Sequence, residues 1–119
     1  MTAPFNRLLG VEFGEYHDDG VSLRLPLVAH HHNGAGVVHG GVMLTLADAA
    51  LGFGIARAVG KRCTTAELKI NFLRPVSEGE LVARSKILRA GRKLVVARAE
   101  LMCVDKHVAE VLATFAILD

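Results

Sequence analysis

Four residues of this chain could act together on a carbonyl compound, namely Asn33, His39, Gly40 and Asp48. Gly40 and Gly41 open an apolar segment that is predicted to be helical, so ligand atoms could reach the backbone N–H groups at its positive end. Such N–H groups stabilise the oxyanion that forms when a carbonyl carbon is attacked. Asp48 lies about two helical turns further on, where an unpaired carboxylate among apolar residues is costly. The residues alone leave two interpretations of Asp48 open: a catalytic acid, or a core residue paired with backbone donors or an arginine.

Hydrophobic periodicity predicts the elements that position these residues. We expect a short helix at 4–9, a strand at 21–27, a polar loop at 30–36, a helix at 41–59, and strands at 67–72, 80–90, 93–104 and 108–118. Pro26 suits an edge strand, and Gly91-Arg92 suits a hairpin turn. The pattern predicts one α+β domain over residues 1–119, with element order β-α-β-β-β-β and a largely antiparallel sheet.

The predicted central helix lacks a polar face, because only Thr45 and Asp48 are polar between Val42 and Ala56. The apolar run 40–56 carries Asp48 at its middle and is shorter than the roughly 20 residues of a membrane span. We therefore expect a buried core helix and no membrane partner. One sheet covers one side of such a helix, so the other side predicts an obligate dimer.

Composition excludes other classes of function. The chain has 14 Lys and Arg against 12 Asp and Glu, only 5% aromatic residues and no Trp, which argues against nucleic-acid binding. Cys63 and Cys103 lie in no metal-ligand or redox spacing, so we expect buried, inert thiols. The first residues show no secretory signal, and the expected location is the cytoplasm.

The segment His39-Gly40-Gly41, followed by Leu46-Ala47-Asp48-Ala49-Ala50 and preceded by Asn33, resembles the PaaI-type (phenylacetate-pathway) family of hotdog-fold acyl-CoA thioesterases. The segments 71–75, 79–80 and 91–93 also resemble that family, so the likeness covers most of the chain. It implies a hotdog fold and hydrolysis of an aryl- or medium-chain acyl-CoA to free acid and CoA. It further implies no cofactor, and a homodimer with its active sites at the subunit interface, paired into a homotetramer.

The resemblance also implies roles for individual residues. Asp48 matches the catalytic carboxylate, acting as general base on water or as nucleophile, and Gly40 matches the residue whose N–H polarises the thioester carbonyl. Asn33 matches a residue near the thioester that comes from the subunit opposite the catalytic acid. His39 matches a residue that positions the carbonyl side or the helix entrance. Thr65 matches a hydroxyl that orients the nucleophile, although the adjacent Thr64 could take its place because only one of them can point inward.

Other residues that could bind ligands receive simpler interpretations. Arg89, Arg92 and Lys93 cluster at the predicted hairpin turn and are the preferred candidates for the CoA phosphates. His30-His31-His32 is expected to be a solvated loop near the mouth of the site, with no metal bound, because consecutive residues point in different directions. Met43, Phe53 and Met102 are interpreted as core residues first and as the lining of an acyl pocket second.

Two alternative functions stay open at this stage. A hotdog-fold hydratase or dehydratase would pair His39 with Asp48 for proton transfer, although the spacing of Asn33 favours hydrolysis. A non-catalytic acyl-CoA-binding module would keep the fold without the reaction. The sequence does not determine the acyl group, the tetramer arrangement, or whether Asp48 acts as base or nucleophile.

Overall fold

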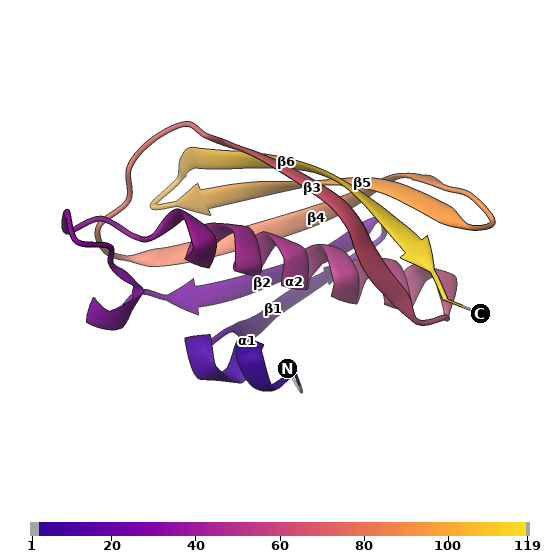
Figure 1. Ribbon diagram of the computed structural model, residues 1–119, viewed down its shortest axis with the longest axis horizontal. Helices are drawn as coiled ribbons and strands as arrows, with labels where there is room; N and C mark the ends of the chain where they lie inside the picture. Colours follow the sequence, from indigo (N-terminus) through magenta and orange to yellow (C-terminus); the bar gives the residue numbers. More distant parts are fainter. Residues whose placement is uncertain (1–2, 119) are drawn as a thin grey trace.

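The computed structural model describes residues 3–118, which form two α-helices, a short 3-10 helix and six strands (Figure 1). In chain order these elements are α1 Pro4–Leu9, β1 Glu12–His17, β2 Gly20–Pro26, η1 Ala29–His31, α2 Gly40–Val59, β3 Cys63–Phe72, β4 Glu80–Ala90, β5 Leu94–Cys103 and β6 Lys106–Ile117. The predicted α+β architecture, with one long helix and an antiparallel sheet, is confirmed.

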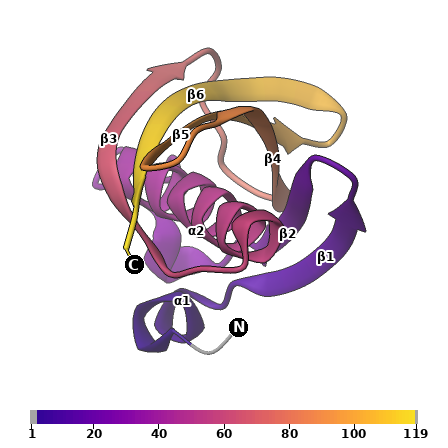
Figure 2. The same cartoon turned by 90° about the vertical axis from the view of Figure 1, so that its right-hand side faces the viewer.

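The sheet wraps around α2 (Figure 2). Its strands pair antiparallel in the order β1-β2-β4-β5-β6-β3, so β1 and β3 are the two edges. Buried and less buried residues alternate along β5, where Val95, Ala97, Ala99 and Leu101 are fully buried, because successive side chains in a strand point to opposite faces. These four residues form part of the core that faces α2.

Among residues 3–118, α2 is the one helix that is long and apolar enough to cross a membrane by length and composition. In the structure its buried residues lie in the hydrophobic core of the domain. Its sequence places apolar residues on every side, and several of them, including Ala49 and Phe53, stay only half-buried. The helix is therefore the core helix of the domain, and part of its apolar surface is not covered by its own sheet.

A close contact fixes the C-terminal half of α2 against the start of β2. A Cβ atom at Gly20 would lie 1.9 Å from the Ser85 carbonyl oxygen, and one at Gly54 would lie 2.8 Å from Ser85 Oγ. The Ser85 hydroxyl accepts a hydrogen bond from the Val21 N–H (3.0 Å) and donates one to the Val21 carbonyl (3.2 Å). Only glycine allows helix and strands to approach this closely, so these residues set the height of α2 above the sheet.

An ion pair closes the turn between β1 and β2. Arg84 Nη2 donates to Asp19 Oδ1 at 2.9 Å, and the Ile87 N–H donates to the Asp19 carbonyl at 2.8 Å. The hydrogen bond from Arg84 holds the pKa of Asp19 below its ordinary value. Both side chains are 36% exposed, so the pair adds little to stability and acts mainly to hold the turn against β4.

Two details of the predicted sheet are wrong. The chain has a strand before β2, because Glu12–His17 pairs with β2 and forms the outer edge. Pro26 therefore does not mark an edge strand: it is the last residue of β2, beyond the last pair with β1, which joins Glu12 to Arg24. Proline is tolerated there because the ladder with β1 has already ended.

Candidate active site

The first turn of α2 presents one backbone donor without a partner. His39 caps the helix: its Nδ1 accepts from the Gly41 N–H at 2.8 Å, and its carbonyl accepts from the Val42 N–H at 2.9 Å. The Gly40 N–H, by contrast, donates to no group among residues 3–118. Because Nδ1 accepts, the neutral His39 ring carries its proton on Nε2. The predicted carbonyl-binding donor, Gly40, is thus the N–H that remains available at this helix end.

An open, mainly apolar cavity of about 460 Å³ lies beside Gly40. A Cβ atom at Gly40 would lie 2.8 Å from the ring of Phe72, which is 53% exposed. The helix end therefore sits close under that ring, and a side chain at residue 40 would require the Phe72 ring to shift. The cavity is lined by Val38, Gly40, Met43, Phe72, Leu73, Arg74, Pro75 and Val76.

Asp48 lies in a different cavity, of about 390 Å³, at the middle of α2. Thr65 Oγ1 donates to Asp48 Oδ1 at 2.6 Å, a short bond typical of a hydroxyl on a carboxylate. Oδ2 has no hydrogen-bond partner among residues 3–118 and stays free to accept a proton. The cavity is lined by Ala3, Asn6, Asp48, Ala49, Gly52, Phe53, Cys63, Thr64, Thr65 and Phe115.

A bulge in β3 directs Thr65 toward the helix. The register with β6 shifts between Thr65, which pairs with Phe115, and Glu67, which pairs with Thr114. The extra residue lets Thr65 point to the same face as Leu68, three positions later, although strict alternation would send one of them outward. Thr65 is half-buried and Thr64 is exposed, so Thr65 is the threonine that the structure brings to Asp48.

Cys63 also lines the Asp48 cavity. Its thiol is half-buried, and burial raises its pKa, with the negative charge of Asp48 adding to the shift. The expectation of two buried thiols is therefore correct for Cys103 and wrong for Cys63, which borders the cavity. Burial also raises the pKa of Cys103, so both thiols stay largely protonated near neutral pH.

Asn33 lies in the loop before α2, at the Gly40 end. Its Oδ1 accepts hydrogen bonds from the Ala35 N–H (2.8 Å) and the Val37 N–H (3.3 Å), so it shapes the loop while its amide nitrogen stays free for other contacts. Within one chain, Asn33, His39 and Gly40 gather at the N-terminal end of α2. Asp48 and Thr65 gather at its middle, in the other cavity.

The expectation of a solvated histidine loop is wrong for His31, which is 1% exposed. Its Nδ1 accepts from the Val28 N–H at 3.1 Å, and its Nε2 lies 2.7 Å from the Leu9 carbonyl, to which it donates. His32 Nε2 similarly lies 2.6 Å from the Ser77 carbonyl. These two rings tie the loop to α1 and to the segment before β4.

A basic cavity of about 550 Å³ lies where the β4–β5 hairpin meets the end of α2. Of the three predicted CoA-binding residues, the structure brings Arg92 and Lys93 to this cavity together with Lys61, while Arg89 is not in its lining. Lys61 comes from the turn after α2, 31 positions before Arg92 in the sequence. Sequence spacing could not show that this lysine joins the hairpin, because strand pairing brings them together.

Three further side chains lie close enough to share a metal ion, namely Glu100, His107 and Glu110. Arg98 already pairs with both carboxylates, at 3.3 Å from Glu100 and 2.7 Å from Glu110. His107 Nε2 lies 2.9 Å from Glu110 Oε1. The group is therefore an ion-pair network on β5 and β6, apart from both cavities of α2.

Asn6 lines the Asp48 cavity and had no signal in the sequence. It reaches the cavity from α1, a helix of only six residues with no buried side chain, which contacts α2. Phe53, interpreted from the sequence as a core residue first and an acyl-pocket lining second, borders the same cavity from α2. Both positions follow from how α1 and α2 pack, which spacing along the chain does not encode.

Comparison with known proteins identifies the family of the chain. The model of the thioesterase superfamily matches residues 35–110. The medium/long-chain acyl-CoA thioesterase YigI of Salmonella typhimurium is 30% identical, with 96% of this chain and 85% of that protein covered. A Halobacterium salinarum protein with an esterase name is 34% identical over 75% of this chain, and the match covers 63% of that protein's length.

Solved structures show the same fold. A conserved protein from Pseudomonas aeruginosa is similar with a TM-score of 0.94 and 35% identity, over 99% of this chain and 96% of that one. The PaaI protein of the Escherichia coli phenylacetic acid degradation operon gives a TM-score of 0.92 at 22% identity, over 99% of this chain and 86% of that one, a likeness of fold. The long helix wrapped by a six-stranded antiparallel sheet is the hotdog fold. The chain belongs to the thioesterase superfamily and is a thioester hydrolase.

Proposed function

We propose that the chain hydrolyses acyl-CoA thioesters to a free acid and CoA, with an aryl or medium-chain acyl group. The observation that carries the proposal is Asp48 in an open cavity, with one oxygen held by Thr65 and the other free. A carboxylate oriented in this way can remove a proton from water or attack a carbonyl carbon directly. The printed name of the Salmonella relative supports an acyl-CoA substrate.

Two subunits must supply one active site. Gly40 and Asp48 are eight positions apart on one helix, which corresponds to about 12 Å. An oxyanion donor lies about 3 Å from the carbonyl oxygen, and the attacking group about 3–3.5 Å from the carbonyl carbon. Both contacts cannot be made to one carbonyl across about 12 Å. We therefore pair Gly40 and Asn33 of one subunit with Asp48 and Thr65 of the other.

The surface around Asp48 suits this association. β3 pairs only with β6 among the described residues, so its other edge is free to bond to a second chain. Ala49, Gly52 and Phe53 of α2 are only half-buried beside it. A second copy placed antiparallel over this face would cover the apolar side of α2 and bring its helix N-terminus to Asp48. Pairing of such dimers into a homotetramer in the cytoplasm completes the proposal.

The proposed reaction uses these residues and water. In the general-base route Asp48 takes a proton from water as the hydroxide adds to the thioester carbonyl, and the Gly40 N–H binds the resulting oxyanion. The tetrahedral intermediate then expels the CoA thiolate, which receives the proton from Asp48, and the acid is released. In the nucleophilic route Asp48 attacks the carbonyl carbon, the C–S bond breaks and the CoA thiolate leaves. Water then hydrolyses the resulting mixed anhydride, which releases the free acid and regenerates the Asp48 carboxylate, and the proton released goes to the thiolate.

The basic cavity is proposed to hold the CoA phosphates. Lys61, Arg92 and Lys93 supply three positive charges around it. Arg89, outside the cavity lining, is left without a role in phosphate binding.

Thiol release from a panel of short, medium and aromatic acyl-CoAs tests the proposed function. We expect hydrolysis by the wild-type chain and a loss of about 10²–10⁴-fold in kcat for Asp48→Asn, the usual size of a general-base contribution. Asn can still accept from Thr65, so the variant should fold and assemble normally. Enoyl-CoA hydration without thiol release, or full activity of the folded variant, would contradict the proposal.

A further inference from the structure

Phe53 separates the Asp48 cavity from a second one along α2. It borders the cavity that holds Asp48 and also an open cavity of about 360 Å³ lined by Tyr16, Phe53, Ala56 and Arg57. This inference rests on the proposed function, in which the thioester carbonyl lies at Asp48 and the acyl chain extends from it. We infer that an aliphatic acyl chain extends along α2 toward this second cavity, and that the Phe53 ring limits its length.

The face of α2 between the two cavities offers room for a linear chain. Asp48, Ala49, Gly52, Phe53 and Ala56 recur at the spacing of one helix face, and they span about 12 Å from first to last. Ala49, Gly52 and Ala56 are small, and all three are only half-buried. Phe53 is the one large side chain on this path, so it is the residue that can block it.

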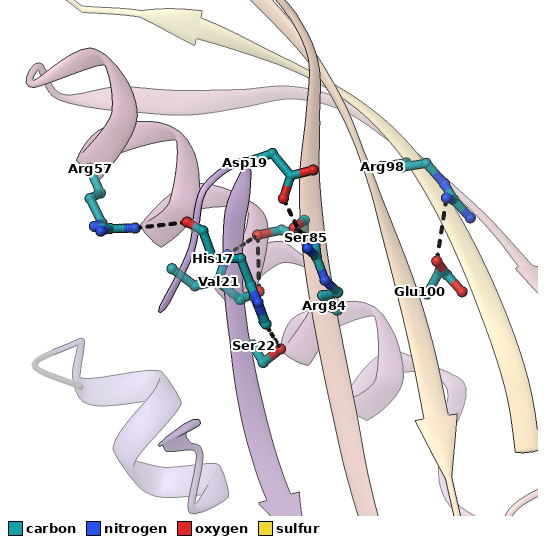
Figure 3. A network of polar contacts seen from close by, with 9 residues as sticks. All are labelled: His17, Asp19, Val21, Ser22, Arg57, Arg84, Ser85, Arg98 and Glu100. Atoms are coloured by element: carbon teal, nitrogen blue, oxygen red, sulfur yellow. Dashed lines mark hydrogen bonds and ion pairs between the residues drawn. The ribbon is translucent and has the colours of Figure 1, made fainter. Parts of the chain in front are cut away.

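Aromatic contacts hold the Phe53 ring in place. Its centroid lies 5.9 Å from that of Phe13 and 6.3 Å from that of Tyr16, and these two rings are 4.6 Å apart. Arg57 in turn fixes Tyr16, with its guanidinium 4.2 Å above that ring and Nη1 donating to the His17 carbonyl at 3.1 Å (Figure 3). A ring packed on two others is costly to displace, so it sets a defined limit to the chain.

The inference assigns a substrate class to the site, namely aliphatic acyl chains of medium length. Beyond Asp48 the path runs along a helix face of small or apolar side chains, namely Ala49, Gly52, Phe53 and Ala56. A chain that ends before Phe53 fits this face, whereas a longer chain meets the ring. Removing the ring joins the two cavities, and each additional buried methylene should then raise kcat/KM about fourfold.

The test compares chain-length profiles of kcat/KM, measured with saturated acyl-CoAs from four to sixteen carbons. Phe53→Ala should shift the optimum by two to four carbons, raising the ratio for long over medium chains roughly 16- to 250-fold. Phe53→Leu, a milder change that protects folding, should shift it in the same direction by less. Phe5→Ala is the matched control, because Phe5 is an exposed phenylalanine of α1 that lines neither cavity. Its profile should match that of the wild type.

Ala56→Leu added to Phe53→Ala refills the outer cavity and should reverse the gain for long chains. An unchanged optimum in both Phe53 variants would overturn the inference while leaving hydrolysis intact. A shift produced instead by Met43→Ala, which enlarges the cavity beside Gly40, would also overturn it by placing the chain there. If no acyl-CoA releases thiol with any of these proteins, the proposed function itself fails, and this inference fails with it.

Discussion

The proposed division of the site between two subunits predicts that two inactive variants restore each other. Gly40→Pro removes the free N–H at the first helical position, where proline is favoured. His39 already has φ −62° and ψ 133°, the conformation that a following proline requires. The helix should therefore persist, and loss of one oxyanion donor should lower kcat about 10²–10³-fold. Gly40→Ala is the control, because it keeps the N–H and its Cβ would meet only the far end of the exposed Phe72 ring.

The size of the recovery follows from how the two substitutions are distributed between the two sites of a mixed dimer. In a mixed dimer of Gly40→Pro and Asp48→Asn chains, one site carries both substitutions and the other carries neither. If equal amounts exchange at random, half of the dimers are mixed and half of their sites are intact. The mixture should then release thiol at about a quarter of the wild-type rate, although each parent is nearly inactive.

The assay uses chains refolded together or expressed together, followed with a chromogenic thiol reagent. A blank without substrate corrects for Cys63 and Cys103, which should react slowly because burial raises the pKa of both thiols. Parents mixed without exchange provide the baseline. A mixture that stays at this baseline after verified exchange would refute the two-subunit site, since both groups would then act within one chain.

Three further outcomes are expected. Thr65→Val should lower kcat about 10-fold or more through loss of the hydrogen bond to the catalytic carboxylate, whereas Thr64→Val should leave it unchanged in the same thiol-release assay. Gly20→Ala should cost about 3 kcal/mol or more of unfolding free energy in urea, because its Cβ would overlap a backbone carbonyl, and a wild-type midpoint would contradict the packing of α2. Since Arg84 lowers the pKa of Asp19, the folded carboxylate contributes stability above its unfolded pKa, and this is lost as pH falls through the folded value. Asp19→Asn should thus cost less than about 1 kcal/mol at neutral pH and nothing near pH 2, as urea unfolding at both pH values would show.

Residues with strong local patterns were predictable from the sequence. The helix at Pro4–Leu9 and the strand at Glu80–Ala90 have the expected bounds, and α2 begins one residue before the expected start. β1 could not be predicted because Glu12–His17 lacks a clear alternation of apolar residues and gains its stability by pairing with β2. β1 and β2 form a hairpin in which β1 takes the sheet edge, and this explains why Pro26 gave a misleading indication.

Candidate site residues could be named from the sequence, whereas their positions relative to one another within the chain could not. The spacing of Asn33, Gly40 and Asp48 follows one motif, yet the structure places Asp48 in a separate cavity from Gly40. The pairing of Thr65 with Asp48 depends on a bulge in β3, and no glycine or other turn residue in that strand indicates the bulge. Asn6 and Lys61 reach their cavities through tertiary packing, which periodicity cannot reveal.

His31 has a practical consequence for anyone who modifies the N-terminus. Its imidazole bonds to the carbonyl of Leu9, and its own carbonyl accepts from the His39 N–H at 2.8 Å. The last residue of α1 is therefore connected through a single buried side chain to the residue that caps α2. A truncation or fusion that unravels the first nine residues would remove that anchor and loosen the entrance to the catalytic helix.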